Sequence, residues 1–145
     1  MRQLLAHAAH LGVTVHVAHL PEPYRGFYDH ERRRVVYDFG LTPIERACVL
    51  AHELGHAFHG HRGRDDPAAE AAADAYAAAL LVDPAHYARL EAIGLSPGEI
   101  AEELGVTVKM LRAFVDHHLV RVRGAAYTRP RLGGHQDGHL ARSAS

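Results

Sequence analysis

The sequence has little of three things: cysteine, net charge and long apolar runs. Its 145 residues include one cysteine, so an internal disulfide is impossible and a reducing compartment is the natural setting. The formal net charge of −1 gives no whole-chain electrostatic argument for binding nucleic acid or an anionic membrane. No run is long enough to span a bilayer, and residues 1–11 lack the apolar core of a signal peptide. We therefore expect a cytoplasmic protein with no membrane partner.

Histidine, in contrast, is abundant, with 14 copies, and two of them lie in the pentapeptide His52-Glu53-Leu54-Gly55-His56. On an α-helix, residues four apart share a face, so both imidazoles can reach one metal ion. Glu53 lies about 100° round the helix from His52, close enough to polarise a metal-bound water. In a histidine-rich chain such a pair can also arise by chance on a packed helix, so the surrounding sequence has to decide.

The helix that carries this motif is clearly delimited. Thr42-Pro43-Ile44-Glu45 is a capping box with proline at the first helical position, so the helix should begin there. Apolar residues dominate the helix and predict that it is buried; they are Ile44, Ala47, Leu50, Ala51, Leu54, Ala57 and Phe58. Burying two histidines and a glutamate among them is costly unless something pairs with them, and a metal ion is the simplest partner.

A catalytic zinc site needs a third protein ligand, and the next helix supplies a candidate. Asp66-Pro67 is typical of an N-cap followed by proline, and a run of alanine and leucine extends from there to Val82. The run contains two acids, Glu70 and Asp74, four apart on one face. The alanines let the helices approach closely, which brings Glu70 to the metal. Asp74 could accept a hydrogen bond from a ligating histidine and fix its tautomer. Dipole-favoured N-terminal acids would explain Glu70 but not Asp74.

Three other residues compete as ligands. His59 projects about 20° from His52 and His61 projects onto the opposite face, and we interpret both as C-terminal helix histidines. The extended pattern H-E-x-x-H-x-x-G-x-x-H needs Gly at 59 and His at 62, whereas the chain has His59 and Arg62, which excludes that class. Cys48 lies one turn before His52. A thiol there could modulate the metal, but a small buried core residue is the favoured interpretation.

The two helices together resemble the ImmA/IrrE family of metallo-endopeptidases. The stretch from Glu70 to Leu81 is similar to that family's E-x-x-A-(N/D)-x-(F/Y)-A-x-x-L-L segment. Phe27-Tyr28, the run 34–38 and Glu45-Arg46 resemble its upstream strand pair and lead-in, so the likeness covers roughly residues 10–85. The departures are a short link between the two helices and a final proline displaced to position 84.

The resemblance implies a gluzincin-like site and a substrate class. In this sequence the Zn²⁺ ligands would be His52, His56 and Glu70, with Glu53 as general base and Asp74 behind the ligands. The substrate would be a helix-turn-helix transcriptional repressor of a mobile element, a phage or a stress response. Two alternatives stay open: a non-catalytic, zinc-stabilised module that binds a repressor or DNA, and a general metallopeptidase acting on small peptides. An oxyanion-stabilising donor must exist, and Tyr24, Tyr28, Tyr76 and nearby histidines are all candidates among which the sequence does not choose.

The pattern before the motif predicts an α+β fold, with a small antiparallel sheet packed on a zincin-like helix pair. Residues 2–11 are typical of a short helix, and 13–17 alternate as a half-buried strand. Residues 24–28 and 33–39 are typical of a hairpin. An edge strand of that sheet would be available to pair with an extended substrate, as peptidases hold a backbone.

The pattern after the motif predicts helices. Asp83-Pro84 opens one that ends at Gly94, and Ser96-Pro97-Gly98-Glu99 is a second capping box. The helix it opens should end at Leu104, and Thr107 caps a last helix to about Leu119, with the spacing of a helix-turn-helix. We expect three parts: a metallopeptidase domain over 1–94, a helix-turn-helix-like extension over 95–123, and a disordered tail over 124–145.

This extension has few residues that favour contact with DNA. Its second helix offers base edges only Lys109 and Arg112, while Glu99, Glu102 and Glu103 surround the first helix. We therefore favour packing beside the cleft, or docking of a protein substrate, over direct DNA binding. His135 and His139 in the tail are interpreted as incidental, and the sequence gives no oligomeric state.

Overall fold

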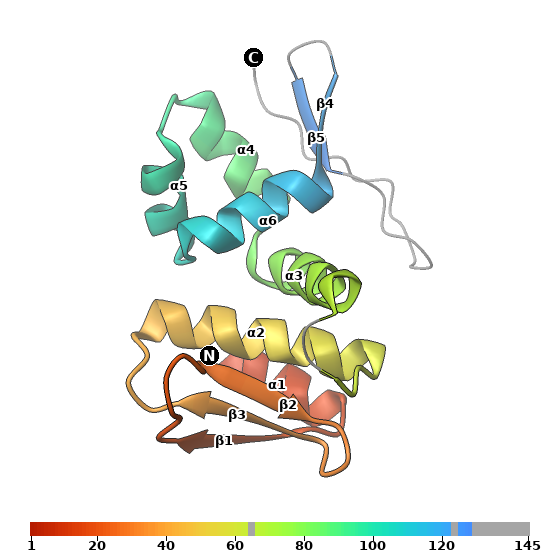
Figure 1. The fold of residues 1–145 in the computed structure, drawn as a ribbon. Helices are drawn as coiled ribbons and strands as arrows, with labels where there is room; N and C mark the ends of the chain where they lie inside the picture. The colour runs from red at the N-terminus through yellow and green to blue at the C-terminus, as the bar shows by residue number, and fades with distance from the viewer. Residues whose placement is uncertain (64–65, 123–124, 129–145) are drawn as a thin grey trace. The chain divides into compact units, whose positions relative to one another are not determined.

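The computed structural model describes residues 1–63, 66–122 and 125–128 (Figure 1). In chain order the elements are α1 (Arg2–His10), β1 (Thr14–Ala18), β2 (Gly26–Asp29), β3 (Arg34–Asp38), α2 (Pro43–His59), α3 (Pro67–Leu81), α4 (Pro84–Ala92), α5 (Pro97–Leu104), α6 (Val108–His118), β4 (Leu119–Val122) and β5 (Ala125–Thr128). This confirms the α+β class. The chain divides into two compact units, residues 1–77 and 78–145, and the division falls inside α3.

The first unit contains a three-stranded sheet in the order β1-β3-β2. The predicted hairpin is present, because β2 and β3 pair antiparallel with Phe27 opposite Val36. The sheet as a whole is mixed rather than antiparallel, since β1 pairs parallel with β3, with His16 opposite the same Val36. β1 and β2 run in opposite directions but do not pair, because β3 inserts between them. β2 is thereby left as an edge strand of the sheet.

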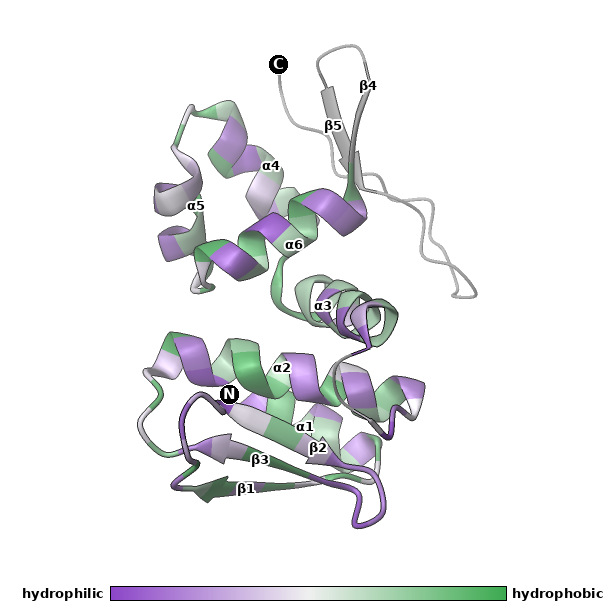
Figure 2. Ribbon diagram, in the orientation of Figure 1, coloured by the Kyte–Doolittle hydropathy of each residue, from purple (hydrophilic) through white to green (hydrophobic). Residues whose placement is uncertain are grey.

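The core of the first unit lies between the sheet and α2. The central strand β3 buries Val35 completely, and α2 packs against β2 and β3 with Leu50 and Leu54 equally buried. α1 contacts both β1 and α2. Figure 2 shows hydrophilic residues interrupting the apolar ones along α2, so the helix that supplies the core also carries polar groups into it. The burial predicted for this helix is confirmed for its middle, whereas Ile44 and Phe58 near its ends are exposed.

Both ends of α2 follow from local sequence. The Thr42 hydroxyl accepts from the Glu45 amide at 3.2 Å, and the Glu45 carboxylate accepts from the Thr42 amide at 3.1 Å, which is the predicted capping box. The helix ends at His59 because Gly60 adopts a left-handed conformation with φ 70°, which glycine reaches without steric cost. α2 is therefore fixed at both ends of the H-E-x-x-H segment.

The second unit contains α4, α5 and α6, followed by an antiparallel β4–β5 hairpin. Ser96 forms the predicted capping box, and α5 packs on α6. Phe114 is 1% exposed, with its ring centroid 5.3 Å from that of Tyr87. Of the described residues, no helix is both long and apolar enough to cross a bilayer.

The last helix ends at His118, within one residue of the end expected at about Leu119, and Leu119 already belongs to β4. One expectation for the C-terminal region needs correction. The tail predicted to be disordered from Gly124 onward contains a strand, because β5 pairs with β4 through Ala125 opposite Val122. A short alternating segment of this kind gains strand character from a partner, which composition alone does not reveal. Residues 129–145, with His135 and His139, lie outside the described part of the chain.

Candidate metal centre

The site lies where α2 meets α3. A Cβ added to Gly55 would stand 2.8 Å from both the Cα and the carbonyl oxygen of Ala73, so at this point the two backbones touch without an intervening side chain. Asp66 supports the start of α3, since its carboxylate accepts from the Ala68 amide at 3.0 Å. The close approach brings the acids of α3 within reach of the histidines of α2.

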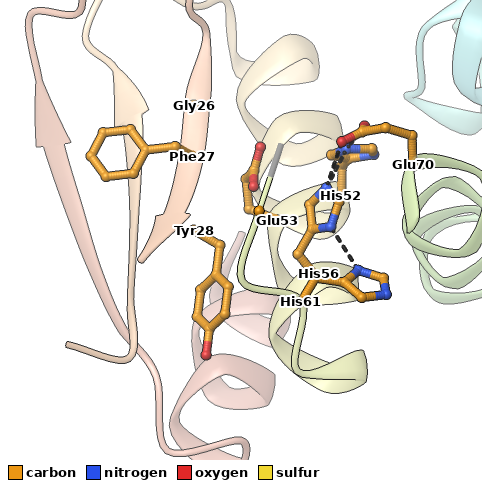
Figure 3. Close-up of a pocket in the computed structure, with 9 residues that line it drawn as sticks. Gly26, Phe27, Tyr28, His52, Glu53, His56, His61 and Glu70 are labelled. Carbon is orange, nitrogen blue, oxygen red and sulfur yellow. Dashed lines mark hydrogen bonds and ion pairs between the residues drawn. The ribbon is translucent and has the colours of Figure 1, made fainter. Parts of the chain in front are cut away.

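Three side chains converge at this crossing (Figure 3). The Nε2 atoms of His52 and His56 are 3.1 Å apart. One carboxylate oxygen of Glu70 lies 2.9 Å from the Nε2 of His52, and the other lies 3.1 Å from the Nε2 of His56. One nitrogen or oxygen from each residue falls within 4.8 Å of the others, so the three could hold one metal ion.

The chemistry of these groups fits zinc. The Nδ1 of His52 lies 2.8 Å from a carboxylate oxygen of Asp74. Because an ionised carboxylate can only accept, this Nδ1 carries a proton, which leaves Nε2 as the nitrogen of His52 that would bind a metal. Two imidazole nitrogens and one carboxylate form a usual ligand set of catalytic zinc, which keeps a fourth position open. The structure thus brings together all four residues that the sequence predicted for the metal and its support.

The surroundings of the ligands are negatively charged. Burial lowers the pKa of His52, but the hydrogen bond that His52 donates to Asp74 and the charges of Glu53, Asp74 and Glu70 outweigh it, so the pKa stands above its usual value. Burial and the neighbouring His52 lower the pKa of His56. A cation between these groups would meet an environment that already favours positive charge.

Glu53 lies beside the ligands and is 9% exposed. Figure 3 shows its carboxylate between β2 and the two imidazoles. Its backbone neighbour across this gap is Gly26, where an added Cβ would stand 3.6 Å from the Glu53 Cγ and 2.6 Å from the Val49 Cγ1. The absence of a side chain at Gly26 therefore lets β2 lie close to Glu53.

A cavity of about 300 Å³ opens onto this group. It is lined by the predicted ligands, by Glu53, by the edge strand β2 and by the segment that follows α2; the lining residues are Gly26, Phe27, Tyr28, His52, Glu53, His56, His61, Gly63 and Glu70. The cavity is thus bounded by one strand, the ligand helix and the acid helix. It leaves room beside the ligands for a small group of atoms.

His61 is the residue whose place sequence reasoning missed. Helical projection put it on the face opposite His52, but α2 ends at His59 and Gly60 reverses the chain. His61 therefore lines the cavity, and its Nδ1 lies 2.9 Å from the Nδ1 of His56. The glycine directly before it was the available signal. Of the other competing ligands, His59 is exposed, while Cys48 is buried in the core at 6% exposure.

The tyrosines proposed as oxyanion donors lie in different surroundings. Tyr28 lines the cavity, and its hydroxyl is 3.1 Å from the Nδ1 of His30. Tyr76 forms a hydrogen bond with the Nε2 of His7, away from the ligands. Tyr24 is 48% exposed. Tyr28 is therefore the one of these three tyrosines that lines the cavity, as the histidine His61 also does.

Comparison with known proteins agrees with this geometry. A family model described as the IrrE N-terminal-like domain, from a family of peptidases, matches residues 8–115. A search of curated proteins found no match. The matched range covers most of the chain, including the sheet, both helices of the site and the helices that follow. The chain belongs to the ImmA/IrrE family of metallopeptidases.

Proposed function

We propose that this protein is a zinc-dependent endopeptidase whose metal is held by His52, His56 and Glu70. The observation that carries the proposal is the convergence of these three side chains within 4.8 Å, beside the buried Glu53 and an open cavity. Membership of a metallopeptidase family supports the reaction class. Zinc is favoured over other metals because imidazole and carboxylate in this combination suit it.

The division of roles follows from position. When bound, zinc supplies Lewis acidity, which polarises a carbonyl and lowers the pKa of water. Glu53 is not among the three converging residues but lines the same cavity, and its carboxylate would take a proton from the attacking water and give it to the leaving amine. Asp74 holds His52 with Nε2 unprotonated, and Glu70 contributes a carboxylate from the opposite helix.

The substrate is proposed to bind as an extended strand. β2 is the edge of its sheet, and its residues Gly26, Phe27 and Tyr28 line the cavity next to Glu53. A peptide added along this edge would run past the ligands with its backbone held by main-chain hydrogen bonds. This binding mode requires an extended or locally unfolded segment, so the enzyme would cut proteins at exposed loops or linkers.

We further propose that the protein substrate is a helix-turn-helix transcriptional repressor, of a mobile element, a phage or a stress response. The likeness of the two helix motifs to this family is what suggests such a substrate, and a repressor substrate would in turn mean that the enzyme acts in the cytoplasm. Cutting a repressor between its DNA-binding and assembly parts would release the repressed genes. An extended linker between such parts is the kind of segment that an edge strand can hold.

The proposal is tested by comparing new protein N-termini in host cells that express wild type, Glu53→Gln or Glu102→Gln at matched levels. Glu102 is exposed on α5, so its variant controls for the loss of one carboxylate. We expect one dominant cleavage in a helix-turn-helix protein with wild type and with Glu102→Gln, and none with Glu53→Gln. A Glu53→Gln protein that still relieves repression would instead favour a zinc-stabilised binding module. Cleavage of many unrelated peptides would favour a general peptidase.

A further inference from the structure

The end of α2 places one imidazole against another. The Gly60 amide donates to the Ala57 carbonyl at 3.2 Å, and the His61 amide donates to the His56 carbonyl at 3.0 Å. This pair of bonds around a left-handed glycine is a Schellman ending, in which the residue after the glycine folds back onto the residue five positions earlier. An apolar contact commonly accompanies such an ending. Here the two residues in contact are His56 and His61.

The rings of His56 and His61 form a hydrogen bond through their Nδ1 atoms. Their Nδ1 atoms are 2.9 Å apart, and the ring centroids are 5.1 Å apart at an interplanar angle of 66°. On its other side the His61 ring stacks on His59, with centroids 5.3 Å apart and planes 18° from parallel. The hydrogen bond between the two rings is drawn in Figure 3. The backbone, this hydrogen bond and the stacking on His59 all constrain the ring of His61.

Accounting for protons gives this hydrogen bond a direction. A neutral imidazole has one donor and one acceptor nitrogen, so one of the two facing Nδ1 atoms carries the proton. The Nε2 of His56 faces His52 at 3.1 Å and Glu70 at 3.1 Å, and as a ligand atom it must be unprotonated. The proton of His56 is then on its Nδ1, which donates to the Nδ1 of His61.

We propose that His61 is a positioning residue that holds His56 in its Nδ1–H form, with Nε2 free to bind the metal. His61 would do for His56 what Asp74 does for His52, so each histidine of the H-E-x-x-H pair has its own acceptor. The inference rests on the proposed metal site and deepens it. It also assigns His61 a tautomer, with the proton on Nε2.

Two substitutions of His61 distinguish the effect of its hydrogen-bond acceptor from the effect of its size. His61→Phe keeps an aromatic ring but has no acceptor, whereas His61→Asn keeps an acceptor oxygen at nearly the same distance from the backbone as Nδ1. The readout is zinc affinity of the purified protein, by competition with a chromophoric chelator. His16→Ala, at an exposed position on β1, controls for loss of one imidazole in a histidine-rich chain.

We expect His61→Phe to bind zinc about 10- to 100-fold more weakly than wild type, and His61→Asn and His16→Ala to stay within about threefold. Equal affinities of His61→Phe and wild type would overturn the inference while leaving the metal site in place. His61→Asn binding as weakly as His61→Phe would also overturn it. If wild type itself bound no zinc, the proposed metal site would fail instead.

A measurement on wild type does not depend on how the variants fold. Imidazole ¹⁵N shifts of the zinc-loaded protein report which ring nitrogen carries a proton. We expect His56 to be protonated at Nδ1 and metal-bound at Nε2, and His61 to be protonated at Nε2 only. A proton on the Nδ1 of His61 would contradict the inference.

Discussion

Gly55 and Ala73 let two helices touch. A Cβ on Gly55 would stand 2.8 Å from the Cα and the oxygen of Ala73, closer than real Cβ contacts come. Since Gly55 lies one residue before His56, this contact sets the distance across which Glu70 reaches both histidines. A glycine is therefore needed at position 55 because any side chain there would collide with α3.

Gly55→Ala should force α2 and α3 apart. Overpacking of this kind costs about 1–3 kcal/mol of stability, and separating the helices should also weaken zinc binding. Gly98→Ala, in α5, is the matched control, because nothing lies within 4 Å of an added Cβ there. The measurements are chemical unfolding and zinc affinity. Wild-type zinc affinity in Gly55→Ala would show that the helix contact does not set the site.

Glu70→Ala should lower zinc binding sharply, because it removes the carboxylate that faces both imidazoles. Glu102→Ala, at an exposed position on α5, should leave zinc binding unchanged. Zinc content after dialysis against a weak chelator gives the comparison. Unchanged stoichiometry in Glu70→Ala would mean that another residue, such as His59, Cys48 or His61, supplies the third ligand.

Asp74→Ala should weaken zinc binding by about 10- to 100-fold, the usual effect of removing the acceptor behind a ligating histidine. The carboxylate accepts from the His52 Nδ1 at 2.8 Å. Asp74→Asn keeps an acceptor oxygen and should lose much less. If Asp74→Asn and Asp74→Ala proved equally weak, the negative charge of Asp74 would matter more than the hydrogen bond, and the tautomer argument would fall.

Gly26→Ala should impair cleavage more than zinc binding. The added Cβ would stand 2.6 Å from the Val49 Cγ1 and 3.1 Å from the Val36 oxygen, so we expect β2 to shift away from α2. Glu53 and the substrate edge would be displaced, while the metal ligands would not be touched directly. We expect zinc affinity within about threefold of wild type and a clear loss of turnover. If zinc affinity and turnover fell together, Gly26 would be needed for the packing of the whole domain rather than for the position of β2 beside Glu53.

Asp38 should contribute to stability in a pH-dependent way. Its carboxylate accepts from the Leu20 amide at 2.8 Å and the Gly40 amide at 2.9 Å, and these bonds lower the pKa of Asp38 below its usual value. A carboxyl with a lower pKa in the folded state stabilises fully above its unfolded pKa of about 4 and loses this contribution as the pH falls through the folded pKa. Urea unfolding of Asp38→Asn should therefore show a shallower loss of stability in acid. Glu31→Gln, at an exposed turn position, should retain the wild-type slope.

Local capping signals predicted where α2, α3, α4, α5 and α6 begin, whereas α1 begins without a side-chain cap. Thr42 and Ser96 lie where the capping boxes put them, because such a box satisfies the first helical amides with groups from four consecutive residues. Glu70 and Asp74 were also predictable, since two acids four apart in an alanine-rich helix must share a face.

The rest depended on contacts between distant residues. β1 pairs parallel with β3 because β3 lies between β1 and β2 in the sheet. The sequence of a single strand does not show which strand will lie beside it. His61 was misplaced because the helical period was continued through Gly60, where the helix ends. Beyond a left-handed glycine, the neighbours of a residue are decided by the cap geometry rather than by the helical period.

The central claim is that His52, His56 and Glu70 form a single zinc site with Glu53 beside it. A crystal of the zinc-loaded protein, measured at wavelengths on either side of the zinc absorption edge, tests this most directly. We predict one anomalous peak bonded to the Nε2 atoms of both histidines and to the Glu70 carboxylate, with a fourth position open to water and facing Glu53. Zinc bound elsewhere, or a fourth protein ligand closing the site, would contradict the account.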